Sequence, residues 1–209
     1  MRISAAILAA GATAVLAVGA GAVPAFAAPA APSADSTISA TYPVTGTTTI
    51  KKLNTSVALG PGSLAVVLDT TQSTLTATLS LPAATVSTTV LGIPVTATTN
   101  FIQDGQATGT ADLSTNTVST TANETLQITS LKVGVLSIPV GNNCETVKPA
   151  SITVNSQSGF NVLFGGNLAG TYTIPAFAHC GIATLLLNLT IPGAGNPITL
   201  TLGGATLTS

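Results

Sequence analysis

The sequence contains very little charge. Asp, Glu, Lys and Arg make up 5% of its 209 residues, against roughly a quarter in an ordinary soluble domain. Catalysis, metal binding and phosphate recognition depend mainly on these side chains and on histidine. The scarcity of charge therefore argues against every class of function that needs a cluster of ionisable groups.

Basic residues are too few for nucleic-acid binding. Five Lys and Arg occur in the whole chain, and Lys51-Lys52 is the only adjacent pair. A protein that binds a polyanion needs clustered Lys and Arg to displace counterions. We therefore expect no nucleic-acid partner.

Histidine is almost absent, which limits the reactive sites that the chain can build. His179 is the only histidine and stands next to Cys180. Adjacent side chains of an extended segment point to opposite faces, so His179 is badly placed to activate that thiol. No Gly-x-Ser-x-Gly motif is present. We expect no catalytic residues, keep an enzyme only as a third interpretation, and place His179 in a turn or on the surface.

The acidic residues do not form a recognisable site. They are scattered, and no Asp-x-Asp-x-Asp loop occurs, although calcium held by backbone carbonyls stays open. We expect no metal ligands and no cofactor. Six acids are present: Asp35, Asp69, Asp104, Asp112, Glu124 and Glu145.

Long apolar runs are confined to the N-terminus. Arg2 precedes an Ala/Val/Leu run, and Ala25-Phe26-Ala27 matches a small-x-small cleavage site before Ala28. The alternative, a transmembrane anchor, is disfavoured because Gly and Pro interrupt the run and no basic flank follows it. We predict a signal peptide over residues 1–27, a flexible leader over 28–36, a single domain over 37–209, and a secreted protein without a transmembrane anchor.

Threonine is abundant and replaces charge as the polar residue. The chain has 37 Thr, which alternate with Leu, Val, Ala and Ile. Such alternation is typical of half-buried strands, and it is clear in residues 74–81, 184–191 and 198–202. Turn signals such as Gly60-Pro61-Gly62 and Asp104-Gly105 separate the runs. The pattern predicts an all-β fold, an antiparallel sandwich or barrel.

Two stretches resemble each other, residues 63–95 and 106–140. Asp69 aligns with Asp112 where a strand enters a turn, and residues 90–95 align with 135–140 if two residues are inserted. This indicates a duplicated strand unit, or else two hairpins built from the same kinds of residue.

Cys144 and Cys180 are the only cysteines. An even count in a secreted chain favours a disulfide. We therefore predict a structural bridge between them.

The C-terminal third resembles a family of secreted actinobacterial proteins of unknown function. The resemblance is carried by Cys144-Glu145-Thr146-Val147-Lys148-Pro149, by Gly170-Thr171-Tyr172-Thr173-Ile174-Pro175, by Cys180-Gly181-Ile182-Ala183-Thr184 and by Leu187-Asn188-Leu189-Thr190-Ile191-Pro192-Gly193. Residues 42–46 and 57–62 resemble the start of the same domain. The resemblance implies a β-rich extracellular domain with paired cysteines and no particular activity.

These observations favour two functions. The first is a non-enzymatic extracellular or cell-envelope-associated module that acts by structure or interaction, with an envelope component or a protein as its partner. The alternative is a carrier for an apolar, lipid-like molecule held in a cavity between sheets rich in Leu, Val and Ile.

Overall fold

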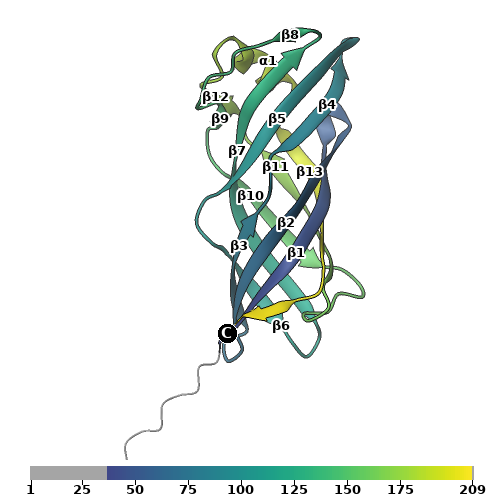
Figure 1. The fold of residues 1–209 in the computed structure, drawn as a ribbon, viewed down its shortest axis with the longest axis vertical. Coiled ribbons are helices and arrows are strands. Elements are labelled where there is room, and N and C mark those ends of the chain that lie inside the picture. The colour runs from purple at the N-terminus through teal and green to yellow at the C-terminus, as the bar shows by residue number, and fades with distance from the viewer. Residues whose placement is uncertain (1–36, 209) are drawn as a thin grey trace, which may run out of the picture. The chain divides into compact units, whose positions relative to one another are not determined.

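A computed structural model describes residues 37–208, which form 14 strands and one short α-helix (Figure 1). The predicted signal peptide and leader lie outside the described residues, as does the proposed cleavage site. The strands are β1 (Thr37–Ile50), β2 (Thr55–Asp69), β3 (Thr74–Ser80), β4 (Ala84–Val90), β5 (Ile93–Gln103), β6 (Ala107–Asp112), β7 (Thr117–Val133), β8 (Leu136–Ser137), β9 (Glu145–Thr146), β10 (Ala150–Ser156), β11 (Gly166–Ile174), β12 (Phe177–Ala178), β13 (Gly193–Leu202) and β14 (Thr206–Thr208). The helical segments are η1 (Lys51–Leu53), η2 (Gly181–Ala183) and α1 (Thr184–Thr190).

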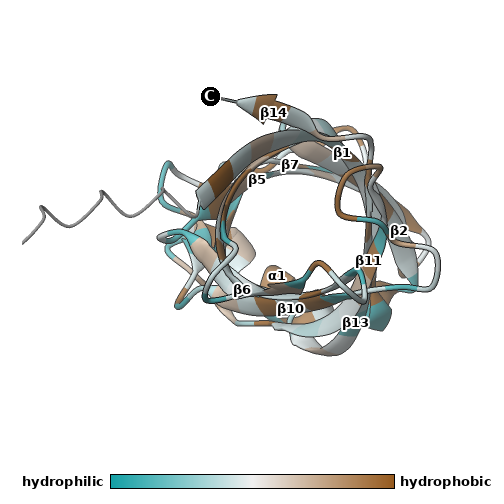
Figure 2. Ribbon diagram, turned by 90° about the horizontal axis from the view of Figure 1, so that it is seen from below, coloured by the Kyte–Doolittle hydropathy of each residue, from teal (hydrophilic) through white to brown (hydrophobic). Residues whose placement is uncertain are grey.

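Eight strands form a closed antiparallel barrel. Their order is β10-β11-β13-β1-β2-β3-β6-β7, and β7 pairs with β10 to complete the ring. Seen from below, the strands surround a central axis (Figure 2). Closure pairs both edges of every barrel strand over part of its length, which removes the exposed edges of an open sheet. The predicted all-β fold is confirmed, and of the two expected architectures it is the barrel.

Alternation places the aliphatic residues inside the barrel. Ile198, Leu200 and Leu202 of β13 are buried. Leu75 and Ala77 of β3 are buried in the same way, while Thr74 and Thr78 face outwards. The strands expected near 74–81 and 198–202 are therefore confirmed. Threonine suits the outward positions because its branched Cβ favours an extended backbone and its hydroxyl meets water.

Strand β7 belongs to two parts of the sheet. Its first half pairs with β6 and β10, and its second half pairs with β5, which in turn pairs with β4. The exchange occurs at Glu124, which lies opposite both Ala150 of β10 and Gln103 of β5. Glu124 is thus fixed where the barrel wall changes from one set of partners to the other.

The prediction of a strand over residues 184–191 is wrong. Thr184–Thr190 form helix α1 instead. Leucine is a strong helix former, and Leu187 and Ala183, four residues apart, share the buried side. Asn188 holds the helix against β12, because its side chain accepts a hydrogen bond from the Phe177 N–H at 2.7 Å and donates one to the Phe177 carbonyl at 2.9 Å.

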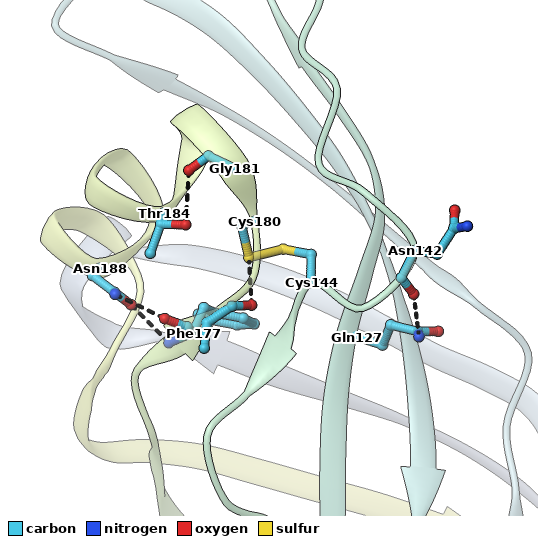
Figure 3. The surroundings of a disulfide bond; sticks show 9 residues. Gln127, Asn142, Cys144, Phe177, Cys180, Gly181, Thr184 and Asn188 are labelled. Carbon is cyan, nitrogen blue, oxygen red and sulfur yellow. Dashed lines mark hydrogen bonds between the residues drawn. A yellow bond between two sulfur atoms is a disulfide. The ribbon is translucent and has the colours of Figure 1, made fainter.

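The predicted disulfide is confirmed. Cys144 and Cys180 are joined with an S–S distance of 1.97 Å, and both are fully buried. The bridge ties the residue before β9 to the segment that leads into η2 and α1 (Figure 3). The Cys144 carbonyl also accepts a hydrogen bond from the Ile128 N–H of β7 at 2.8 Å. The disulfide therefore fastens α1 and its flanking loops to the barrel wall.

Asp69 and Asp112 close equivalent hairpin turns, as expected. The Asp69 Oδ1 accepts the N–H groups of Thr71 and Gln72, at 2.8 and 2.9 Å. The Asp112 Oδ1 accepts those of Ser114 and Thr115, at 2.8 and 3.2 Å. Each turn ends in a residue with a φ of 54°, Ser73 or Asn116.

The alignment of residues 90–95 with 135–140 does not match the structure. Val90 pairs with Ile93 across the β4–β5 turn, and Val133 pairs with Leu136 across the β7–β8 turn. The counterpart of Val90 is therefore Val133, and the spacing equals that between Asp69 and Asp112. No insertion is needed, and the duplication itself stays a prediction.

Within residues 37–208, no helix has the length and apolar character needed to cross a membrane.

Candidate ligand cavity

The lower half of the barrel, as oriented in Figure 1, encloses a cavity of about 530 Å³. All eight barrel strands contribute to its wall, and most of the side chains that line it are aliphatic. Its volume falls within the range of roughly 300–1,000 Å³ that is typical of small-molecule sites. We call it the lower cavity.

Small side chains create this space. The interior of an eight-stranded barrel is just wide enough for ordinary aliphatic side chains to fill it. Here several inward positions carry alanine instead, so the opposing walls do not meet. These alanines are Ala40, Ala77, Ala107, Ala111 and Ala122.

The upper half of the molecule contains a smaller void of about 70 Å³, which we call the upper cavity. The two cavities share no lining residue: on β7, Glu124 lines the lower cavity and Leu126 lines the upper one. The lower cavity therefore ends near Glu124 on this strand.

The lower end opens to solvent through an apolar rim. Four residues line the lower cavity and are also exposed, which places them at its mouth: Ile38, Leu113, Leu163 and Leu207. Aliphatic side chains at this position give an apolar molecule a continuous surface from the outside to the interior.

A loop between β10 and β11, residues 157–165, crosses part of this mouth; we call it the rim loop. The Tyr42 hydroxyl of β1 donates a hydrogen bond to the Val162 carbonyl at 2.8 Å. The Val162 N–H donates to the Asn116 side chain at 3.3 Å, and the Ala205 N–H donates to the Leu163 carbonyl at 2.8 Å. The rim loop is thus held by hydrogen bonds to three separate parts of the barrel.

Glu124 is the only acidic residue that lines the lower cavity within the described chain. Its inward row on β7 includes Val118, Thr120 and Ala122, which also line the cavity. The residue is 4% exposed, and its Oε1 has no hydrogen-bond partner among the described residues. Burial disfavours the charged form and raises the pKa of the Glu124 carboxyl to about 7.

Gln103 completes the wall beside Glu124. The pairing of β3 with β6 ends at Ala77. Beyond it, the Gln103 side chain donates a hydrogen bond to the Ala77 carbonyl at 2.9 Å and accepts one from the Leu79 N–H at 2.6 Å. The amide of Gln103 therefore satisfies β3 backbone groups that have no partner on β6.

In the sequence Glu124 is one of six scattered acids, and its place in the cavity was not predicted. The signal was present, because positions 123 to 128 alternate in burial and place Glu124 in the same row as Leu126 and Ile128. Recognising it requires residues 117–133 to be identified as one strand. The segment begins with Thr and Ser at both inward and outward positions, so its sequence does not show which row of side chains is buried.

The other candidate residues do not line the lower cavity. His179 is exposed in the loop before η2, with a φ of 57°, and lines neither cavity. Asp104 and Asp112 are exposed, and Glu145 lies on β9. Across residues 37–208, no three His, Cys, Asp or Glu side chains are grouped so that they could hold a metal ion.

In comparisons with known proteins, no protein-family model, no curated protein and no solved structure matches the chain.

Proposed function

We propose that this protein binds and carries an elongated apolar molecule in the lower cavity. The observation that supports the proposal is a cavity of about 530 Å³ with aliphatic walls and an open, aliphatic rim. Protein interiors are normally close-packed, with few voids larger than a water molecule. An apolar occupant would bury the exposed aliphatic wall and regain the dispersion contacts that the alanines leave unmade.

The proposal is tested by filling the cavity. Ala122→Phe places a ring inside the lower cavity, whereas Ala65→Phe adds the same ring on the outer face of β2, between the cavity residues Leu64 and Val66. A fluorescent fatty-chain probe is titrated into each variant. We expect the wild type and Ala65→Phe to bind the probe alike, and Ala122→Phe to bind at least ten times more weakly. Equal binding by all three proteins would contradict the proposal.

An envelope-associated interaction module is a second candidate, and the upper end of the molecule supports it. Leu91 of the β4–β5 turn is 97% exposed, and Val135 of the β7–β8 turn is 99% exposed. The two turns are neighbours, because the Gly134 N–H donates a hydrogen bond to the Pro94 carbonyl at 2.7 Å. Such a tip suits contact with apolar envelope material. This function is compatible with the carrier and, like secretion, stays a proposal.

Cell fractionation tests the second candidate. Leu91→Ser combined with Val135→Ser should release the protein from the envelope without affecting probe binding in the lower cavity. Leu185→Ser, which alters an exposed leucine on α1, is the control and should stay in the envelope fraction. A wild-type protein that is free in the medium and monomeric would exclude this candidate.

A further inference from the structure

On the basis of the proposed carrier function, we infer that the Glu124 carboxyl binds the polar end of the ligand at the end of the lower cavity away from the rim, and that this polar end is an uncharged oxygen group. The ligand class is then a single-chain lipid with a hydroxyl head, such as a long-chain alcohol. It would enter head first and leave its chain along the aliphatic wall towards the rim.

The position of Glu124 supports a head-first arrangement. The inward row of β7 begins near the rim at Val118 and reaches Glu124 after about 20 Å of extended strand. The next inward residue, Leu126, already borders the upper cavity. Glu124 is therefore the last residue of β7 that lines the lower cavity, and it would meet the end of a long ligand.

The unpaired Oε1 of Glu124 supports a hydrogen-bonding ligand. Nearly all buried polar side-chain atoms in proteins have a partner, and leaving one without a partner is costly. A protonated carboxyl has one donor and an accepting oxygen, and a hydroxyl has the matching donor and acceptor. Burial raises the pKa of Glu124 to about 7, so the neutral carboxyl predominates in mildly acidic solution.

The lining of the cavity disfavours charged heads. No Lys, Arg or His among the described residues lines it, so a phosphate or carboxylate head would have no cation there. An ammonium has three N–H donors, and a single carboxyl cannot satisfy them all. Tyr42 is the other titratable group in the wall, and its hydroxyl already donates to the Val162 carbonyl.

Neighbouring elements add no charge that faces Glu124. Strands β5, β8 and β10 have no ionisable side chain. On β6, Asp112 is exposed and pairs with Thr117, and on β9 Glu145 pairs with Gln127; both partners belong to the outward row of β7. Asp104, after β5, Lys132, on β7, and Lys148, before β10, have exposed side chains.

Three probes of equal chain length test the inference: 1-dodecanol, dodecane and dodecylamine, each measured by displacement of the fluorescent probe at pH 6. We expect the wild type to prefer dodecanol to dodecane by about 3- to 10-fold, the range of one net hydrogen bond. Glu124→Leu should lose this preference but keep its affinity for dodecane. Glu124→Gln, which retains a donor and an acceptor, should keep the preference.

A pH series adds a second readout. Wild-type affinity for dodecanol should fall as pH rises past about 7, because the ligand must then cover an ionised carboxylate. The affinity of Glu124→Gln should not change over the same range. The infrared carbonyl band of the protonated Glu124, identified by its absence in Glu124→Gln, should shift with dodecanol and not with dodecane.

Other outcomes separate this inference from the carrier function. A Glu124→Leu variant that still prefers dodecanol, or a wild type that binds dodecylamine most tightly, would overturn the role of Glu124 and leave the carrier intact. A wild type that binds none of the three probes would overturn the carrier function as well. Thermal unfolding of each variant confirms that it is folded before these comparisons are made.

Discussion

At the scale of single residues, Glu124 links the stability of the barrel to pH. Its carboxyl has an ordinary pKa of 4.5 and a pKa of about 7 in the folded protein. Between these values the folded state holds a proton that the unfolded state has released, so the free energy of unfolding falls as pH rises. The stabilising contribution is complete below about pH 4.5 and is lost by about pH 7.

Glu124→Gln should remove this dependence. We expect the stability of the variant relative to wild type to rise by at most about 3 kcal/mol between pH 4.5 and pH 8. Urea unfolding at several pH values measures the difference. A difference between the two proteins that stays constant with pH would contradict the burial of this carboxyl.

Gln103 provides a second test at this scale. Gln103→Ala leaves the Ala77 carbonyl and the Leu79 N–H without their partner. We expect the free energy of unfolding to fall by about 1–3 kcal/mol. Gln106→Ala, at an exposed position three residues along, is the control and should change it by less than about 0.5 kcal/mol. Equal effects of the two substitutions would show that Gln103 does not close the wall.

Single residues also show the limits of prediction from sequence. The turn-closing roles of Asp69 and Asp112 depend on backbone groups two and three positions away, so local sequence was sufficient. The partners of Tyr42 and Gln103 are distant in the chain. Their roles depend on which strands become neighbours, and no local pattern contains that information.

At the scale of elements, alternation predicted strands and missed a helix. Residues 74–81 and 184–191 both place aliphatic residues at every second position. The first stretch forms β3 because β2 and β6 pair with its backbone on both sides. The second forms α1. The disulfide at Cys180 fastens the segment before this helix, and the Asn188 side chain fastens the helix itself to Phe177 of β12. Tertiary contacts decided between two conformations that the sequence pattern alone left equal.

The disulfide should stabilise the region around α1. Cys144→Ala combined with Cys180→Ala opens a link across a sequence separation of 36 residues, and the chain-entropy model gives a loss of about 3–4 kcal/mol. Denaturant unfolding measures the total. Hydrogen exchange should show the largest loss of protection in α1 and β12, and little change in β13. A uniform loss across the barrel would contradict a local fastening role.

At the scale of the whole molecule, both faces of the barrel wall contain few ionisable side chains: the outer face is rich in threonine and the inner face is mostly aliphatic. Threonines cover the outer face, so few ionisable groups are needed there. The sequence predicted an apolar interior as the alternative site of function, but the size of that interior depends on barrel closure. Closure requires β7 to pair with β10 and β1 to pair with β13, contacts between segments far apart in the chain. Only then do the inward alanines surround one common space.

Native mass spectrometry of the protein purified from its own host tests the central claim most directly. We predict that the wild type carries a lipid-sized mass in one-to-one ratio, that Ala65→Phe carries the same mass, and that Ala122→Phe carries none while remaining folded. A wild-type protein free of any bound mass, together with a crystal structure in which side chains fill the lower cavity, would contradict the account.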